Sequence, residues 1–545
     1  MKRLAVLLCM YTIMAHAQQK NLDDYYQTCP FTMPLVAVPV FPAKDFNVKD
    51  FGAVANGKTL NTKAFAKAIE ACSNAGGGNV IIPAGEWLTG PIEMKSNVNL
   101  VAQKGALVQF TKDHTQYPIV KSSNTSSNYT TASPIYGYDL KNIAITGEGI
   151  FDGAGDTWRP VKKMKTTDAQ WNNLIATGVL SDDKKIWWPS NEAMNGENYL
   201  KTLKLQGRKL TAEDYLPARD YLRPYMVYFV NCENVLIDGV TLRNSPKFIF
   251  YPNYCTNVTL RNATFFNEWW AQNGDAIDIS GCKNVVIYHC DVNAGDDGIC
   301  LKSSREKSDV SNEATMENIL IAQNKVRRAH GGFVIGSNTD GGIKNVFVSD
   351  CNFIGTDVGI RVKSNSGRGG LVHNIYVDNI TMKDMVNEAV SFDTYYEDVP
   401  AGKEKTVTTS RDKVPEFKDF YISNVFCDGA KTAISITGLP YMPVHDIHFN
   451  NVSIVNAGAG FVSTDAANIE LKKVKIQSSS PIYNINNTSG LHISEAVIPG
   501  NGNVRTFLKA EGKVNDIKIH ATNLSGVKNI TELGKGIDKS AVSVD

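Results

Sequence analysis

The segment Lys283-Asn284-Val285-Val286-Ile287 decides the fold of this 545-residue chain, because copies of its pattern recur along most of the sequence. In each copy, a polar residue and an Asn precede alternating apolar residues, and a polar turn follows. Further copies begin at Lys141, Glu233, Thr256, Glu317, Lys344 and His373, and weaker ones near Asp419, Asp446 and Asn468. From Asn234 to Asn374 the Asn-to-Asn steps are 23, 27, 34, 27 and 29 residues.

This period predicts an all-β fold, a right-handed single-stranded parallel β-helix with one coil per repeat. Each copy is too small to bury its own apolar face, so the copies must stack. Helical repeats are excluded because the apolar spacing is two rather than 3.6 residues. A propeller blade needs four strands in about 40 residues, which these short steps do not accommodate. The asparagines are expected to stack at one turn and satisfy one another's amides.

The N-terminal part predicts a capping helix for this solenoid. Asn61 or Thr62 can start a helix in which Phe65, Ile69 and Cys72 share one face. The glycines at 76–78 end it, and the run from Val80 begins the first strands. Such a helix should cover the open end of the solenoid, as terminal units of a repeat fold must.

The domain organisation follows from this pattern and from the first residues. Residues 1–17 have the basic start, the apolar stretch and the small-x-small end of a signal peptide, and the stretch is too short for a membrane span. Residues 18–44 are an N-terminal extension, and 45–545 form the predicted β-helix domain, with an insertion at 157–222. The protein is therefore expected to be exported, to the periplasm or the medium.

Residues 157–222 break the repeat and hold four of the seven tryptophans, together with basic clusters at 159–163 and 184–185. Two interpretations are equally supported. The segment is either a folded flap over a cleft, which offers aromatic rings and cations to a ligand, or an insertion with an ordinary small core. In both cases each tryptophan is more often a core residue than a ligand.

Charge and cysteine content exclude some functions. The net charge of +1 without a long run of one sign makes nucleic-acid binding through a basic surface improbable. Removal of Cys9 with the leader leaves nine cysteines, an odd number that rules out complete intramolecular pairing. Cys290 and Cys351 occupy matching places in two repeats and are expected to be small buried residues. No metal or cofactor is predicted.

Four short clusters carry the chemistry. Asp275 and Asp297 lie 22 residues apart, His330 follows 33 residues later and Arg361 another 31, so each cluster falls about one coil after the last. Adjacent coils are about 4.8 Å apart, so all four should meet on one outer strip. Paired carboxylates suit acid/base work on glycosidic bonds, and cations suit an anionic substrate. The clusters are Asn273-Gly274-Asp275, Gly295-Asp296-Asp297, His330-Gly331-Gly332 and Arg361-Val362-Lys363.

In this order, these motifs resemble the polygalacturonase family of pectin-degrading glycoside hydrolases (family 28). The start Val48-Lys49-Asp50-Phe51-Gly52-Ala53 also resembles the family's usual start, and the resemblance spans roughly residues 45–500. It implies the same β-helix and hydrolysis of pectin with inversion at the anomeric carbon. The first motif reads Asn-Gly-Asp where typical members have Asn-Thr-Asp, which leaves open whether homogalacturonan or rhamnogalacturonan is the substrate.

The resemblance also implies a role for each residue. Asp296 would be the general acid, and Asp275 and Asp297 would activate the water. Asn273 would orient its neighbour, and His330 would set the protonation state of the acid. Arg361 and Lys363 would bind the uronate carboxylate. An aromatic residue for the sugar on the leaving-group side is expected at Tyr395 or Tyr396, and we choose Tyr395 as the candidate. The insertion could close one end of the cleft, which would favour exo cleavage.

The spacing of the carboxylates conflicts with inversion. Adjacent coils lie about 4.8 Å apart, which is less than the roughly 6.5–9.5 Å between the two carboxyl groups of inverting enzymes. Spacing alone therefore favours retention. Two alternatives to a hydrolase also stay open. One is a calcium-dependent pectate lyase on the same fold, and the other is a β-helix that binds polysaccharide without cleaving it.

Overall fold

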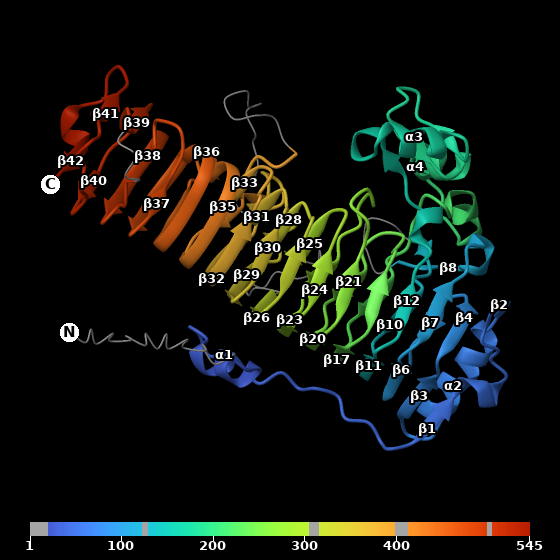
Figure 1. Ribbon diagram of the computed structural model, residues 1–545. Coiled ribbons are helices and arrows are strands. Elements are labelled where there is room, and N and C mark those ends of the chain that lie inside the picture. The colour runs from blue at the N-terminus through green and yellow to red at the C-terminus, as the bar shows by residue number, and fades with distance from the viewer. Residues whose placement is uncertain (1–19, 123–128, 305–315, 398–412, 499–503) are drawn as a thin grey trace, which may run out of the picture.

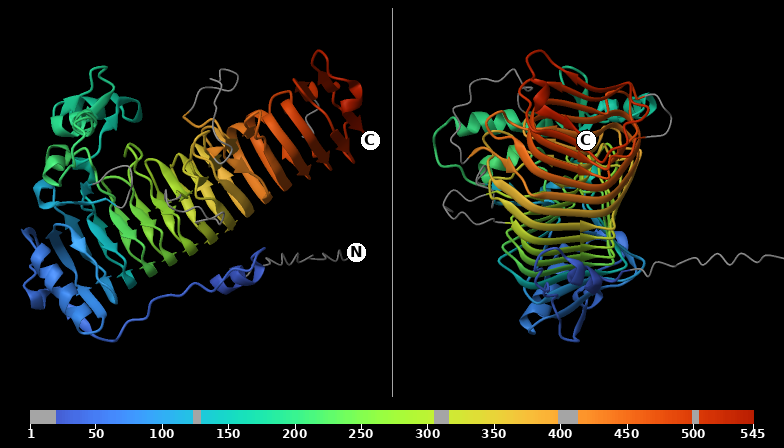
Figure 2. Two further views of the ribbon diagram at one scale, coloured as in Figure 1. Left: turned by 180° about the vertical axis from the view of Figure 1, so that it is seen from behind. Right: turned by 90° about the vertical axis from the view of Figure 1, so that its left-hand side faces the viewer.

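The computed structural model describes residues 20–122, 129–304, 316–397, 413–498 and 504–545. The predicted leader at 1–17 lies outside these residues. The described chain winds into one right-handed parallel β-helix, whose coils follow one another from the capped N-terminal end to the C-terminus (Figure 1; Figure 2). The predicted fold class is confirmed.

The strands that carry the Asn pattern form one long face of the solenoid. Within it, Val235 pairs with Val258, Val258 with Val285, and Val285 with Ile319, so each coil repeats the register of the last. The strands are β1 (Asp45–Asn47), β3 (Gly78–Ile82), β6 (Val98–Ala102), β11 (Lys141–Gly147), β17 (Glu233–Asp238), β20 (Thr256–Arg261), β23 (Lys283–Tyr288), β26 (Met316–Ala322), β29 (Ile343–Ser349) and β32 (Leu371–Lys383).

Two further faces complete each coil. One holds β5 (Ile92–Glu93), β10 (Ile135–Tyr138), β16 (Val227–Val230), β19 (Phe250–Asn253), β22 (Ile277–Ser280), β25 (Asp297–Lys302), β28 (Gly331–Ile335), β31 (Val358–Lys363) and β33 (Glu388–Asp393). The other holds β2 (Asn56–Leu60), β4 (Gly85–Thr89), β7 (Ala106–Phe110), β12 (Ile150–Asp152), β18 (Thr241–Arg243), β21 (Thr264–Phe266), β24 (Asp291–Asn293), β27 (Lys325–Arg327) and β30 (Asn352–Ile354).

Towards the C-terminus the strands lengthen and run around corners of the coil. They are β34 (Glu416–Phe417), β35 (Phe420–Thr437), β36 (Val444–Lys472), β37 (Lys475–Ile476), β38 (Tyr483–Ser494), β39 (Thr506–Glu511), β40 (Ile517–His520), β41 (Asn529–Leu533) and β42 (Val542–Val544). Inside the solenoid, stacked aliphatic side chains form one continuous core in which Val258, Val285 and Ile319 are fully buried. Each such side chain contributes about 1.5–3 kcal/mol by leaving water.

The asparagines form the expected ladder along one turn. The side-chain amide of each Asn donates to the amide oxygen of the Asn one coil before, as from Asn257 to Asn234 at 2.9 Å and from Asn284 to Asn257 at 3.2 Å. Each residue is in the left-handed backbone region, for example φ 58° at Asn284, which Asn tolerates better than most residues. The same bonds link Asn97, Asn142, Asn234, Asn257, Asn284, Asn318, Asn345 and Asn374.

The capping helix is confirmed as α2 (Thr62–Asn74). Phe65, Ile69 and Cys72 are buried on its inner face against the first coils, and α2 covers the N-terminal end of the solenoid (Figure 1). All nine cysteines of the described chain are free thiols, and Cys290 and Cys351 are buried as expected.

The N-terminal segment with α1 (Leu22–Thr28) lies along the outside of the solenoid, on the opposite side from the insertion (Figure 1; Figure 2). Tyr25 and Met33 pack on an outer apolar stripe that includes Val286, Leu320 and Phe347. The Lys20 ammonium pairs with Asp350 at 3.1 Å. The segment from Leu22 to Val36 thus covers apolar surface on the middle coils.

The insertion contains α3 (Asp168–Ile175), α4 (Asn191–Lys204) and a small antiparallel sheet of β13 (Val161–Lys162), β14 (Val179–Leu180) and β15 (Ile186–Trp188). A short pair, β8 (Ile119–Lys121) and β9 (Tyr129–Thr131), precedes it. Trp171 and Trp187 form its core with Val161, and Trp158 stacks on His114 with ring centroids 3.5 Å apart. Three of its four tryptophans are therefore core residues, and Trp188 is half-buried.

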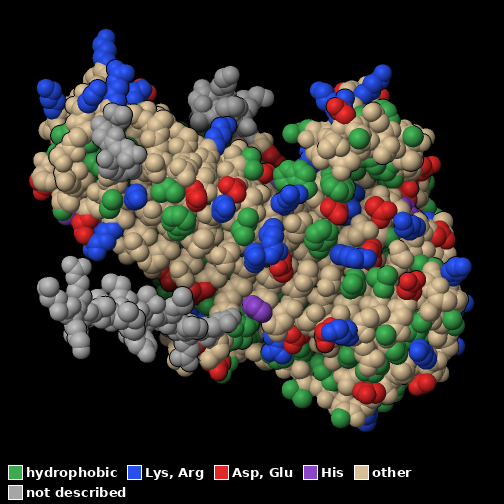
Figure 3. Space-filling view, in the orientation of Figure 1, with side chains coloured by type: hydrophobic (Ala, Val, Ile, Leu, Met, Phe, Trp, Pro, Cys, Tyr) green, Lys and Arg blue, Asp and Glu red, His purple; other side chains and the backbone are tan. Residues whose placement is uncertain are grey.

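The surface agrees with the balanced composition. Acidic and basic side chains are interspersed over the visible face of the molecule (Figure 3). Among the residues that the structure describes, no helix is both long and apolar enough to cross a bilayer.

Candidate active site

The four clusters meet on one strip because the parallel register carries across successive coils. Ile277 of β22 pairs with Ile299 of β25, which puts Asp275 beside Asp297. Asp297 in turn pairs with Gly331 of β28, which puts His330 beside Asp296. β31 is the next strand and supplies Arg361 and Lys363. Residues about ninety positions apart in sequence thus share one surface.

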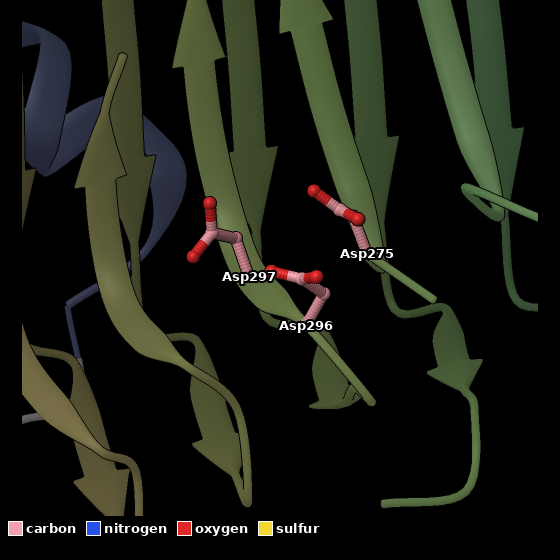
Figure 4. A group of neighbouring side chains, drawn as sticks. All are labelled: Asp275, Asp296 and Asp297. Atoms are coloured by element: carbon pink, nitrogen blue, oxygen red, sulfur yellow. The ribbon is translucent and has the colours of Figure 1, made fainter. Parts of the chain in front are cut away.

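The three carboxylates are close neighbours. Asp296 and Asp297 extend from the start of one coil's strand and Asp275 from the coil before it, and each offers an oxygen within 4.8 Å of the others (Figure 4). Glycines make this approach possible, since a Cβ on Gly295 would lie 2.3 Å from the carbonyl oxygen of Ala271. Three negative charges at this spacing repel one another, so the site must compensate them or keep some protonated.

Asp297 is held ionised by its neighbours. The buried ammonium of Lys363 donates to its Oδ2 at 2.7 Å, and Nη1 of Arg361 lies 3.9 Å from its Oδ1. Burial alone would raise the pKa of Asp297, but the charges of Lys363 and Arg361 outweigh it and lower the pKa well below the usual range. Asp297 is therefore a permanent carboxylate at neutral pH, and Lys363 is largely committed to it.

The pKa of Asp275 is shifted in the opposite direction from that of Asp297. Burial, with the charge of Asp278 next in size, raises its pKa well above the usual range, although Lys302 lies 3.2 Å from Asp275 and 2.5 Å from Asp278. One ammonium is shared by two buried carboxylates, so it cannot compensate both fully. Asp278 and Lys302 were not singled out in the sequence. The alternation in Ile277-Asp278-Ile279, which sets Asp278 on the outer face of β22, is the signal that could have found it.

Asp296 is bound to His330. Nδ1 of His330 lies 2.9 Å from Oδ1 of Asp296, and Nε2 lies 3.0 Å from the Nζ of Lys165. An ammonium can only donate, so Nε2 accepts and the imidazole proton sits on Nδ1, from which it is donated to Asp296. Burial raises the pKa of Asp296, but the hydrogen bond from His330 and nearby cations outweigh this, so the pKa lies below the usual value.

Lys165 belongs to the insertion, yet it reaches this centre. Its ammonium donates to the carbonyl oxygens of Gly295 at 2.7 Å and Trp269 at 3.3 Å and lies 4.5 Å from the centre of the Trp269 ring. The basic clusters noted in the sequence stop just short of it, at 159–163. No sequence signal singled it out, because its partners come from coils more than a hundred residues later.

Asn273 is oriented by a second unpredicted residue. Nη2 of Arg223 donates to Oδ1 of Asn273 at 3.0 Å, and Nη1 donates to the carbonyl oxygen of Gln272 at 2.9 Å. The amide nitrogen of Asn273 is therefore turned away from Arg223. Asn273 itself has φ 50°, a conformation that Asn adopts more readily than most residues.

The aromatic neighbour of the cations is Tyr396 rather than Tyr395. Tyr395 is 9% exposed and packs in a small cluster with Val414 and Leu439. The ring of Tyr396 lies 4.8 Å from the Nζ of Lys363 and 5.4 Å from the guanidinium of Arg361. The two tyrosines follow the end of β33, where the alternation of a strand no longer applies, so the sequence alone does not tell which one faces the strip.

A cavity of about 390 Å³ opens beside His330 on the C-terminal side of the carboxylates. It contains Arg361 and hydroxyl groups, so it can accept a polar ligand. Its lining residues are His330, Asp357, Val358, Arg361, Asn387, Glu388, Ser391, Phe392, Asp393, Ser435 and Thr437.

Comparison with known proteins adds two family matches. The family model described as glycosyl hydrolases family 28 matches residues 211–462, which include every motif of the strip. A second model, described as rhamnogalacturonase A/epimerase, pectate lyase-like, matches residues 46–185.

Curated relatives carry related names. An exo-poly-alpha-D-galacturonosidase of Dickeya chrysanthemi is 30% identical over 75% of this chain and 66% of its own length. A probable polygalacturonase of Vitis vinifera is 28% identical over 63% of this chain and 62% of its own. The chain thus spans slightly less than two thirds of both relatives.

Solved structures agree with the fold. An exopolygalacturonase of Thermotoga maritima superposes with a TM-score of 0.64 at 28% identity, over 86% of this chain and 94% of its own. A family 28 exopolygalacturonase of Yersinia enterocolitica gives a TM-score of 0.63 at 22% identity, over 87% of this chain and 78% of its own, and supports the fold alone.

Proposed function

Because the chain belongs to family 28 of the glycosyl hydrolases, we propose that it is an exported enzyme that hydrolyses α-linked galacturonate bonds in pectin. The observation that carries this proposal is the carboxylate cluster with cations beside it. Asp275, Asp296 and Asp297 each offer an oxygen within 4.8 Å of the other two, and Arg361 lines an adjoining cavity.

The roles proposed for the carboxylates follow from family resemblance and geometry together. Asp296 protonates the leaving oxygen, and Asp275 and Asp297 take the proton of the attacking water. Asp297 is permanently ionised by Lys363 and is thus ready to accept a hydrogen bond from that water. Arg361 binds the uronate carboxylate, because its guanidinium offers several donors and is only 3.9 Å from Asp297 rather than locked to it.

The pKa directions in the substrate-free site differ from what a general acid needs. The pKa of Asp296 is below its usual value, while a general acid must be protonated at working pH. An incoming uronate adds a negative charge next to Asp296, and like charges raise a carboxyl pKa. We therefore expect the anionic substrate itself to bring the acid into its active form.

That expectation is tested by two pH profiles. The alkaline limb of kcat/KM reports the acid in the free enzyme, and that of kcat reports it in the complex. The limb of kcat should lie at higher pH than that of kcat/KM. Coincident limbs would instead favour Asp275, whose pKa is already raised, as the acid.

A leaving group that needs no proton separates these two assignments. Asp296→Asn should lose most activity on polygalacturonate but keep a large share on a nitrophenyl α-galacturonide, while Asp275→Asn should lose both. The reverse result would exchange the two roles. Wild-type activity on the aryl substrate serves as the reference.

Inversion at the anomeric carbon is proposed from the family alone. The short separation of the carboxylates would by itself favour retention. The geometry is compatible with inversion if Asp275 and Asp297 hold one water between them instead of acting across a long gap. Proton NMR of the first product decides, since β-configured galacturonate indicates inversion and α-configured product retention.

Exo action is proposed because the insertion places Lys165 at the centre and two named relatives are exo-acting. Endo-polygalacturonases also occur among the relatives. A timed digest of homogalacturonan and rhamnogalacturonan tests both mode and substrate. Early monomer without intermediate oligomers supports exo action, and a ladder of oligomers contradicts it.

The lyase alternative requires a calcium ion on the carboxylates. Their oxygens are close enough to hold a cation. However, Lys363 is already bonded to Asp297 and Lys302 to Asp275 and Asp278, so the protein's own ammonium groups compensate this charge. An unsaturated, ultraviolet-absorbing product that vanishes with chelator would establish the lyase and exclude the hydrolase.

A further inference from the structure

A second cation, Lys247, lies on the N-terminal side of the carboxylates. Phe250 pairs with Ile277, and the backbone amide of Ile249 donates to the carbonyl oxygen of Asp275 at 2.9 Å. Continuing this register places Lys247 beside Gly274, and Gly274 lies beside Asp296 on the next coil. Lys247 is thus two coils, or about 10 Å, before Asp296 along the strip.

Arg361 lies on the other side of the carboxylates, in register with Val334 and Cys300, and its guanidinium lies 3.9 Å from Asp297. It lies in β31, two coils after the β25 coil that carries Asp296 and Asp297. Each cation has an aromatic face beside it, Tyr396 for Arg361 at 5.4 Å and Tyr225 for Lys247 at 5.0 Å. The carboxylates therefore stand between two cation-and-aromatic positions.

Lys247 differs from the other cations near the centre in its lack of a bonding partner. Lys302 is bonded to Asp275 and Asp278, and Arg223 to Gln272 and Asn273. The ammonium of Lys247 makes no hydrogen bond or ion pair to any residue that the structure describes. It is half-buried, 5.0 Å from the ring centre of Tyr225 and 5.2 Å from that of Phe248.

The surroundings of Lys247 suit a sugar acid. Tyr225, Phe248 and Tyr251 form a cluster with ring centroids 4.5 to 5.4 Å apart, and all three are partly exposed. Aromatic faces pack well against the apolar side of a pyranose ring. Burial, then the charge of Arg223, lowers the pKa of Lys247 to about 8, so an anion would stabilise its charged form.

We propose that Lys247 binds the carboxylate of a second uronate, across the scissile bond from the uronate that Arg361 holds. The bond that this enzyme cleaves then joins two uronates, as in homogalacturonan. In rhamnogalacturonan each bond joins one uronate to a neutral rhamnose, which would leave one of the two cations without a partner. This inference rests on the proposed function and narrows its substrate.

The test compares trigalacturonate with an alternating rhamnogalacturonan oligosaccharide, for wild type, Lys247→Met and Lys247→Arg. Wild type should prefer trigalacturonate by at least about tenfold in kcat/KM. Lys247→Met should lose about 10–100-fold on trigalacturonate, mainly through KM, because a charge-assisted bond to the substrate is removed. Lys247→Arg should recover most of it.

Lys325→Met, on another face of the coil, controls for general effects of a lost lysine. Thermal midpoints of all variants verify folding. Trigalacturonate kinetics within twofold of wild type for a folded Lys247→Met would overturn the inference while leaving the hydrolase intact. So would equal wild-type rates on the two substrates. If wild type hydrolyses neither trigalacturonate nor the rhamnogalacturonan oligosaccharide, both the proposed function and this inference are wrong.

Discussion

The asparagine ladder and the catalytic strip are both built by stacking coils, but only in the ladder do the stacked side chains satisfy one another's hydrogen bonds. Both place polar side chains on successive coils of the solenoid, which lie about 4.8 Å apart. In the ladder each amide donates to the amide before it, at 2.9 to 3.4 Å. In the strip, Oδ1 of both Asp275 and Asp297 is buried without a hydrogen-bond partner among the described residues.

The difference lies in the self-complementarity of the side chain. An amide has a donor and an acceptor, so a column of amides satisfies itself and stabilises the stack. A carboxylate only accepts, so a column of carboxylates needs donors from elsewhere, here Lys302, Lys363 and His330. Two acceptors, Oδ1 of Asp275 and Oδ1 of Asp297, stay without a donor from the described residues.

The largest expected effect comes from removing the acid of the strip. Asp296→Asn keeps the size of the side chain and removes its proton, so kcat on polygalacturonate should fall about 10²–10⁴-fold. Asp291→Asn, whose carboxylate pairs with Arg327 on another face, is the matched control and should retain activity. Equal losses in both variants would show that charge at the surface, rather than the strip, limits the rate.

Breaking the ladder should affect stability and leave catalysis unchanged. Asn284→Ala removes bonds to both Asn257 and Asn318 and puts a less tolerant residue at φ 58°, so the free energy of unfolding should fall by about 1–3 kcal/mol. Denaturant unfolding measures this loss. Asn284→Gly removes the same bonds without the backbone strain, so the difference between the two variants isolates the strain. Loss of kcat in a folded variant would contradict the separation.

Lys165 connects the insertion to the strip and should have a moderate effect. Lys165→Met removes a cation that favours the ionised form of Asp296, so the pKa of Asp296 should rise. The acid then stays protonated to higher pH, so the alkaline limb of kcat/KM should move to higher pH. Lys165→Arg should restore the limb, and the exposed Lys163→Met should leave it in place. If the alkaline limb of Lys165→Met lies at the same pH as that of wild type, Lys165 only connects the insertion to the solenoid and does not affect the pKa of Asp296.

The smallest effect is expected from chelator. Since the lysines already compensate Asp275, Asp278 and Asp297, activity should be unchanged by EDTA. Added calcium should not restore any variant of the strip. Loss of activity with EDTA that calcium reverses would show that a metal shares the carboxylates.

The fold and the strip were accessible to sequence reasoning for the same reason. Both repeat once per coil, so Asn284 or Asp297 can be placed from spacing alone. The residues that escaped prediction have no such period. Lys165 reaches the strip from a segment outside the repeat, and Arg223 and Lys247 precede strands without any motif. Tyr395 and Tyr396 could not be separated, because a turn rather than a strand decides which side chain faces the strip.

The segment with α1 has a consequence for the order in which the chain folds. Lys20 contacts Asp350, and both Lys20 and Tyr25 contact Gln323, roughly three hundred residues later. A chain made from its N-terminus must therefore produce every coil up to that of β29 before this early segment finds its place. Until then the apolar stripe of Val286, Leu320 and Phe347 is bare, which makes half-made chains prone to aggregate. This segment is therefore made long before the surface on which it docks.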